Sequence, residues 1–211
     1  MRGRRASAAC ACVLAAAASR AAAAQTPAPF PQLTVCLVVS PKLSISARAA
    51  TLVVAESNAI WAPHGVAIRS ATLSDDNCDR RISVKGDQEA LADETSSESA
   101  LAWVPFVEGR ARQVVFLRAG LARTLIEALS PGTRPEALTE FLVARLLGRS
   151  LGHELGHVLL NSRGHQGSGL MRARYRARDV LSVPTSAYTL NAVERDRLFA
   201  RTDGEPRVAT R

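Results

Sequence analysis

The stretch TRPEALTEFLVARLLGRSLGHELGHVLL, residues 133–160, decides the fold of this chain. Thr133, followed three residues later by Glu136, matches the capping box that starts a helix, and a proline is tolerated in the first helical turn. The residues that follow predict one long helix that ends near Leu160. One side of this helix should carry Leu138, Phe141, Leu142, Leu146, Ser150, His153 and His157.

Residues 153–157 of this helix read His-Glu-Leu-Gly-His. The two histidines lie one turn apart on the same face, about 6 Å in axial rise, so both imidazoles can reach one metal ion. Glu154 cannot easily be a third ligand from its position, but it can hold a water at the metal. Zinc lowers the pKa of such a water toward about 7. The pattern therefore predicts a zinc hydrolase in which His153 and His157 bind the metal and Glu154 is the general base and later the proton donor. Gly156 would let another group approach this helix closely.

A catalytic zinc needs a third protein ligand and an open position. Three of the four histidines of the chain lie within residues 153–165. His165 is the best candidate, because Gly164 permits a sharp turn that returns the chain over the metal. His64, beside a proline at a helix end, is interpreted as structural. The competing third ligands are the downstream acids Asp179, Glu194 and Asp196, of which Glu194 suits a ligand carried on a helix.

The N-terminal part of the domain predicts a β-α-β unit. Residues 33–39 are an apolar, β-branched run typical of a buried strand, and residues 46–61 have apolar positions at helical spacing. A second strand begins at residues 66–68. Two consecutive strands joined by a helix predict parallel neighbours with a right-handed crossover.

The middle of the chain predicts less regular structure. Residues 73–98 are polar and acidic, which indicates a long surface excursion with one short strand at residues 82–84. Residues 100–107 and 113–118 predict two strands joined in a hairpin. Residues 121–129 and 190–201 predict two more helices. The fold class is therefore α/β, with a mixed sheet, a long helix carrying the histidines and a C-terminal helix.

Residues 1–24 are typical of an export signal, with three early arginines, a short run of small apolar residues and an Ala-rich cleavage site. Residues 25–32 form a Pro-rich lead-in, residues 33–201 a single domain, and residues 202–211 a polar tail. The formal charge of +8 falls to +4 once the four leader arginines are removed. We expect a secreted or periplasmic protein with no stable membrane insertion after signal cleavage. No basic run interleaved with aromatics is present, which argues against nucleic-acid binding.

Two of the four cysteines, Cys10 and Cys12, leave with the leader. Cys36 and Cys78 remain as an even pair in an exported chain. A disulfide between them is the expected state in an oxidising compartment.

The motif region resembles the metzincin clan of zinc peptidases. Residues 168–171, Ser-Gly-Leu-Met, look like the methionine turn that lies below the metal in that clan. The resemblance implies an α+β zincin-like fold, a zinc cofactor held by three histidines, and a peptide or protein substrate. Tyr175 could stabilise an oxyanion, as tyrosines do in some metzincins, although packing is the stronger interpretation. The residues that carry the resemblance are His153, Glu154, Gly156, His157, Gly164, His165 and Met171.

The chain departs from the usual metzincin pattern after the second histidine. That pattern places a glycine and then the third histidine where this chain has Leu160 and Arg163. His165 comes two residues late, which is closer to uncharacterised exported bacterial proteins with the longer spacing. Met171 would be a hydrophobic floor under the ligands and not a ligand itself.

The sequence thus favours a secreted zinc-dependent metallopeptidase. The hairpin at residues 100–118 would supply a strand edge for an extended peptide. Two alternatives stay open: a zinc hydrolase with a non-peptide substrate, and an exported zinc-containing binding protein without catalysis.

Overall fold

The computed structural model describes residues 33–75, 77–94, 99–129, 132 and 134–200. The predicted signal peptide at residues 1–24, the lead-in at 25–32, the tail at 202–211 and the predicted helix cap at Thr133 lie outside these residues. The strands are β1 (Leu33–Val39), β2 (Val66–Ser70), β3 (Arg80–Gly86), β4 (Ala102–Trp103), β5 (Phe106–Val107), β6 (Arg110–Ala111) and β7 (Val114–Leu117). The helices are α1 (Ala47–Trp61), α2 (Ala119–Leu129), α3 (Glu136–Leu160), α4 (Ala177–Ser182) and α5 (Ala192–Ala200), with short 3-10 turns at Ala62–His64, Asp87–Glu89, Ala92–Glu94 and Thr185–Ala187.

The β-α-β start is confirmed. Strands β1 and β2 pair in parallel and α1 crosses between them. The α1 helix begins where the hydroxyl of Ser46 accepts a hydrogen bond from the backbone N–H of Ala49 at 3.0 Å. Asn58 on α1 accepts another from Ile68 of β2 at 2.8 Å, which fixes the helix against its second strand.

The main sheet has the order β2-β1-β3-β7-β4 and is mostly parallel, with β4 antiparallel at one edge. Strand β3 corrects the sequence-based prediction, because it is a central strand and not a short piece of a surface excursion. Its Ile82 and Val84 are fully buried on the helical face, whereas Arg81 is exposed on the other face. The described part of that second face carries only a small apolar cluster of Trp103, Phe116 and Val114. Polar residues are therefore tolerated there.

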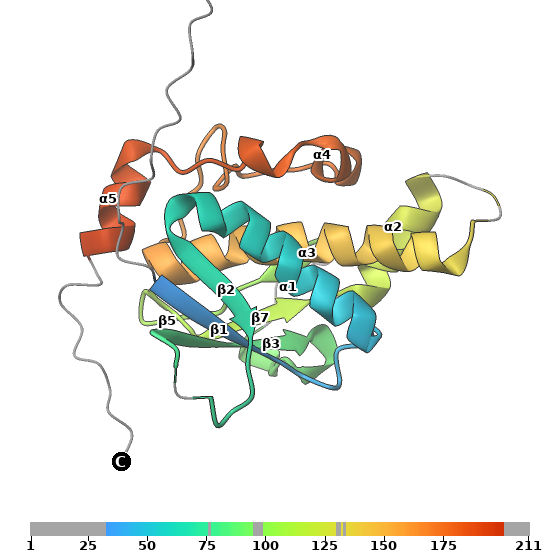
Figure 1. Cartoon of the computed structure of the whole chain (residues 1–211), viewed down its shortest axis with the longest axis horizontal. Helices are drawn as coiled ribbons and strands as arrows, with labels where there is room; N and C mark the ends of the chain where they lie inside the picture. Colours follow the sequence, from blue (N-terminus) through green and yellow to red (C-terminus); the bar gives the residue numbers. More distant parts are fainter. Residues whose placement is uncertain (1–32, 76, 95–98, 130–131, 133, 201–211) are drawn as a thin grey trace, which may run out of the picture. The chain divides into compact units, whose positions relative to one another are not determined.

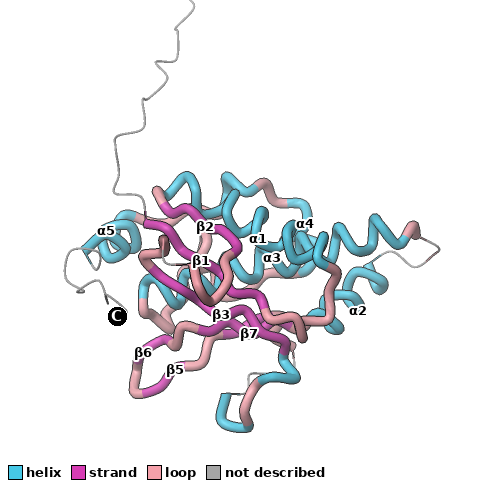
Figure 2. Tube along the Cα trace, turned by 60° about the horizontal axis from the view of Figure 1, so that its bottom comes forward, coloured by secondary structure: helices cyan, strands magenta, loops and turns pink. Residues whose placement is uncertain are grey.

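The predicted hairpin at residues 100–118 is confirmed only in outline. Strand β4 does pair antiparallel with β7, but the chain leaves the sheet at Pro105. Between them β5 and β6 form a separate two-stranded hairpin, visible beside the main sheet (Figure 2). Its turn uses Glu108 and Gly109, both with positive φ. Proline cannot donate to a strand ladder, which explains the break.

Helices α1 and α3 cross the same face of the sheet and lie side by side (Figure 1). Three glycines of α3 lie four residues apart, and the first two allow this close approach. A Cβ at Gly148 would meet the backbone of Val53, and one at Gly152 would meet Ile60 on α1. The third, Gly156, faces Met171. The helical spacing of these glycines is present in the sequence, but a close neighbour was predicted only at Gly156.

The predicted apolar side of α3 is correct only for its C-terminal two thirds. Leu146 is fully buried, whereas Leu138 and Phe141 are 45% and 40% exposed. The helix begins at Glu136, with Pro135 at the N-cap and no side-chain cap. A loop connects α3 to α4, a short helix that the sequence did not predict.

A buried arginine joins three helices. Arg149 of α3 is 2% exposed, and its Nε donates to Glu56 of α1 at 3.1 Å. Its Nη1 donates to the carbonyl oxygens of Val180 and Val183, the latter at 2.6 Å, and its guanidinium lies 5.7 Å from the ring centre of Tyr188. This network holds α4 and the chain after it against α3.

Replacing Arg149 with methionine should destabilise the protein by about 3 kcal/mol, because two carbonyls and the Glu56 carboxylate lose their buried donor. For a chain of this size the melting temperature should fall by about 6–12 °C. Amide exchange at residues 177–183 should accelerate. Arg145→Met is the matched control: Arg145 contacts the same carboxylate at 3.7 Å but is 30% exposed, so its loss should cost below about 1 kcal/mol. Equal melting temperatures for the two variants would contradict the proposed role of Arg149 in holding α4 against α3.

The disulfide prediction is confirmed, since Cys36 of β1 and Cys78 before β3 are bonded at a sequence separation of 42. Such a cross-link stabilises a fold by about 2–4 kcal/mol through the unfolded chain. It indicates a non-reducing environment. Among the described residues no helix has both the length and the apolar character needed to cross a membrane.

Candidate metal centre

The paired histidines of α3 are oriented by backbone carbonyls. Nδ1 of His153 lies 2.7 Å from the carbonyl oxygen of Leu170, and Nδ1 of His157 lies 2.6 Å from that of Ser162. A carbonyl oxygen only accepts hydrogen bonds, so both Nδ1 atoms carry the proton and both Nε2 atoms present lone pairs. These two Nε2 atoms face each other at 3.2 Å. Two lone pairs at that distance repel unless a cation lies between them.

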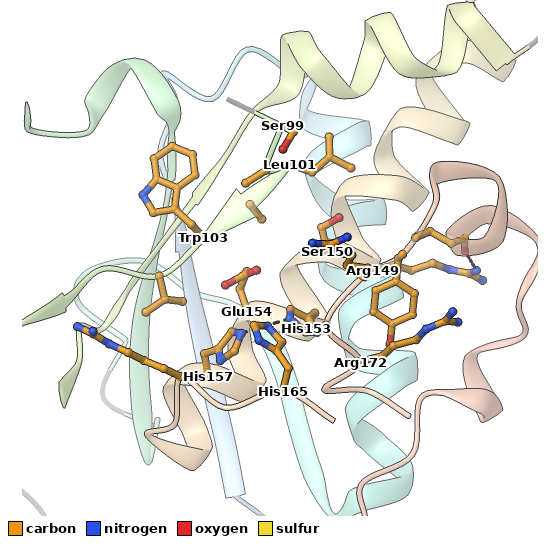
Figure 3. A pocket seen from close by; sticks show the side chains of 18 of the residues that line it. Ser99, Leu101, Trp103, Arg149, Ser150, His153, Glu154, His157, His165 and Arg172 are labelled. Carbon is orange, nitrogen blue, oxygen red and sulfur yellow. Dashed lines mark hydrogen bonds between the residues drawn. The ribbon is translucent and has the colours of Figure 1, made fainter. Parts of the chain in front are cut away.

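The third histidine reaches the same point from the loop after α3. Asn161 ends the helix in the left-handed conformation and its side chain accepts a hydrogen bond from Ala111 of the β5–β6 hairpin. The ring of His165 then stacks on His153, with centres 5.3 Å apart, and meets His157 edge-on at 4.8 Å. One ligand atom from each histidine lies within 4.8 Å of the others. Figure 3 shows the rings converging, with Glu154 beside them.

These three residues form a group that could hold a metal ion. In a tetrahedral zinc site with Zn–N bonds near 2.0–2.1 Å, ligand nitrogens lie roughly 3.3 Å apart. The helical pair already has this spacing. The loop histidine is exposed, so it has freedom to move toward the pair.

In the described part of the chain, the three acidic residues proposed as alternative third ligands do not form a metal-binding group with the histidines. Glu194 is 7% exposed, and its carboxylate accepts from the backbone of Asn191 at 2.8 Å while Asn191 accepts from the backbone of Glu194 at 2.9 Å. This reciprocal pair caps α5. In the described part of the chain, neither Asp179 nor Asp196 joins a metal-binding group with the histidines.

The loop between His165 and Met171 closes on itself. The backbone N–H of Gln166 donates to the carbonyl of Met171 at 2.7 Å, and Leu170 donates to the carbonyl of Thr189 at 2.9 Å. Gly169 has φ +73°, and a Cβ there would collide with the Thr189 carbonyl. This closed turn after His165 places the Leu170 carbonyl beside Nδ1 of His153.

Met171 packs against α3 at Gly156, between the two helical histidines in the sequence. It is 1% exposed, and a Cβ on Gly156 would collide with its Sδ. The glycine therefore makes room for the methionine, which supports the helix face carrying the ligands from below. The expectation that Gly156 admits a close neighbour is confirmed.

The other residues singled out in the sequence have structural contacts. Nε2 of His64 lies 3.0 Å from the Tyr188 carbonyl oxygen. Arg163, at the usual place of the third histidine, stacks on Phe106 at 4.8 Å. The hydroxyl of Tyr175 donates to the carbonyls of Gly169 and Leu170, the latter at 3.2 Å. This favours the packing interpretation of Tyr175 over an oxyanion role.

Desolvation shapes the charges at the site. It lowers the pKa of His153 to about 4, with a smaller contribution from His157, and it also lowers the pKa of His157. Both imidazoles are therefore neutral at neutral pH, which is the form that binds metals. Desolvation raises the pKa of Glu154 to about 8. A cation beside this carboxyl group would favour its ionised form.

The histidines open onto a cleft of about 1280 Å³. Residues 99–107 form one wall, α3 with Ser150 and Glu154 forms the floor, and residues 172–177 with Asp179 and Val180 form the other wall. This volume exceeds the roughly 300–1,000 Å³ of pockets that hold drug-sized ligands.

Comparison of the chain with protein-family models and with curated proteins finds no match. The chemistry therefore has to be inferred from the side chains of the cleft.

Proposed function

We propose that this chain is a secreted, zinc-dependent metallopeptidase with a metzincin-like, zincin-type arrangement. The observation that carries the proposal is the pair of Nε2 lone pairs of His153 and His157, held 3.2 Å apart with His165 beside them and Glu154 in the same cleft. Structural zinc sites are closed by four protein ligands, whereas catalytic sites have three and an open position. Three histidines facing a wide cleft support the catalytic kind.

Zinc would supply Lewis acidity, lowering the pKa of water and polarising a carbonyl group. The protein supplies the rest. The Leu170 and Ser162 carbonyls hold the histidine rings in the ligating tautomer. Glu154 takes a proton from the attacking water and then gives it to the leaving amine.

The substrate class follows from the wall formed by residues 99–107. Strand β4 is an edge strand, and both Ala102 and Trp103 line the cleft. Among the described strands only β7 pairs with it. An extended peptide can therefore add to its outer edge through backbone hydrogen bonds and pass over Glu154. This edge position favours a peptide over other hydrolysable substrates.

The direct test is metal-dependent cleavage of a mixed peptide library by the purified protein, read by mass spectrometry. We expect about one zinc per chain, loss of cleavage after treatment with a chelator, and its return when Zn²⁺ is added back. Cleavage that persists in the metal-free protein would refute the metal mechanism. Stoichiometric zinc without cleavage of any peptide would refute the peptidase assignment, and ester hydrolysis alone would redirect it to a non-peptide substrate.

A further inference from the structure

The two walls of the cleft differ in chemical character. The wall of residues 99–107 presents Trp103, Pro105 and Phe106. Its buried acid, Glu94, is neutralised by Arg112 at 2.7 Å. The opposite wall carries arginines at alternate positions of the segment that precedes α4: Arg172, Arg174 and Arg176.

These arginines are exposed and all three line the cleft. Arg174 and Arg176 have no ion-pair partner among the described residues. Arg172 lies with its guanidinium 5.7 Å from the ring centre of Tyr175. Asp179 is the one acid that lines the same stretch, so the described part of this wall has a net positive charge.

The segment is held close to the histidines. The ring of Tyr175, which separates Arg174 from Arg176, lies 6.0 Å from the ring of His153 and stacks on Tyr188 at 5.8 Å. Its hydroxyl is bonded to the turn under the site. Figure 3 shows Arg172 on the opposite side of the histidines from Trp103. A substrate that lies along β4 and over Glu154 therefore passes within reach of these guanidinium groups.

We propose that the arginine wall selects acidic peptides, binding aspartate or glutamate side chains close to the scissile bond. This inference rests on the proposed function, whose substrate class it narrows. Guanidinium groups suit the task because they are always charged and pair with carboxylates in a two-pronged geometry. The closely spaced positive groups also repel lysine and arginine side chains in a substrate.

A single exposed ion pair contributes little, so three arginines acting together should give roughly a tenfold preference. We expect kcat/KM for a peptide with flanking glutamates to exceed that for the glutamine version, with the arginine version slowest. The preference should shrink at high salt, because the Debye length falls to about 3 Å at 1 M.

The decisive variant is Arg174→Glu with Arg176→Glu, which should reverse the order and favour the arginine-flanked peptide. The matched control is Arg178→Glu with Arg195→Glu. Both control residues are exposed, and neither is among the described residues that line the cleft. The control changes the net charge equally but should keep the acidic preference. An equal effect of both pairs would overturn the inference in favour of general charge attraction.

A binding experiment distinguishes a failure of this inference from a failure of the peptidase proposal. Fluorescence anisotropy with zinc-loaded Glu154→Gln protein measures the same three peptides without turnover. Tighter binding of the glutamate peptide, lost in the Arg174→Glu/Arg176→Glu background, supports the arginine wall even if the wild type cleaves nothing. Equal binding of all three peptides overturns the inference, even if they are cleaved. Stronger binding of a single-stranded oligonucleotide at the same arginines would overturn it in favour of a nucleic-acid ligand.

Discussion

Replacing Glu154 with glutamine should reduce peptide hydrolysis by about 100- to 10,000-fold while zinc content and melting temperature change little. The amide has the shape of the carboxyl group but cannot take a proton from water. The histidines keep their own anchors, since their Nδ1 atoms bond the Leu170 and Ser162 carbonyls and not Glu154. Metal binding and proton transfer can therefore be separated by this one change.

The measurement is kcat on a cleaved library peptide, with zinc determined in the same sample. Glu127→Gln is a suitable control, because Glu127 is exposed on α2 and lies outside the described lining of the cleft. It should match the wild type in rate and zinc content. If the Glu154→Gln protein hydrolysed at the wild-type rate, the general base would have to be another group. If it lost its zinc, Glu154 would hold the site together and its catalytic role would be unproven.

The parts of this site that sequence could predict are those set by local geometry. His153 and His157 share a helix face through the helical period alone, and Glu154 follows from the same helix. Cys36 and Cys78 are bonded to each other, as their even number in the predicted mature chain indicated. These predictions needed no knowledge of which elements pack together.

The parts that sequence could not predict depend on packing over long separations. Arg149, between apolar positions of α3, looks like a solvent-facing charge until Glu56 and the carbonyls of α4 surround it. Strand β3 was predicted as a short surface strand, and not as a central one, for a related reason. Its alternate polar residues indicate a surface segment, whereas the sheet leaves much of one face to polar side chains and buries Ile82 and Val84 on the other.

The path of the ligand loop was the least predictable feature. The sequence of residues 161–171 alone does not predict that Gly169 packs on the Thr189 carbonyl. It also does not predict that the Leu170 carbonyl accepts a hydrogen bond from His153. The sequence predicted a turn at Gly164. The hydrogen bond that fixes the loop, however, runs from the backbone N–H of Leu170 to the carbonyl oxygen of Thr189, in a later segment of the chain. The sequence favoured His165 over Glu194 as the third ligand, and in the structure the Glu194 carboxylate caps α5.

Replacing His165 with alanine should weaken zinc binding by roughly 100- to 1,000-fold. Zinc in a four-ligand structural site binds with about 10–16 kcal/mol, so one ligand accounts for about 3–4 kcal/mol. His165 is exposed and lies on a loop, so its removal leaves the core intact. The Nε2 atoms of His153 and His157 remain 3.2 Å apart, so the variant should keep the zinc affinity of a two-histidine site. Peptide hydrolysis should fall in parallel, and excess zinc should restore only part of it.

The control is His64→Ala, which removes the one histidine of the chain outside the cluster. Its Nε2 contacts the Tyr188 carbonyl, so this variant can lose some stability but should keep the wild-type zinc affinity. Competition with a zinc-sensitive dye gives both dissociation constants under the same conditions. Wild-type affinity in the His165→Ala protein would mean that another group completes the site. That group would have to be brought in by movement of the chain, because the carboxylate of Glu194, the acid that the sequence favoured for a helix-borne ligand, is already bonded to the backbone of Asn191. A drop in affinity confined to His165→Ala would instead assign the third ligand to the loop, and would explain why the turn from Gln166 to Met171 is closed so tightly by backbone hydrogen bonds.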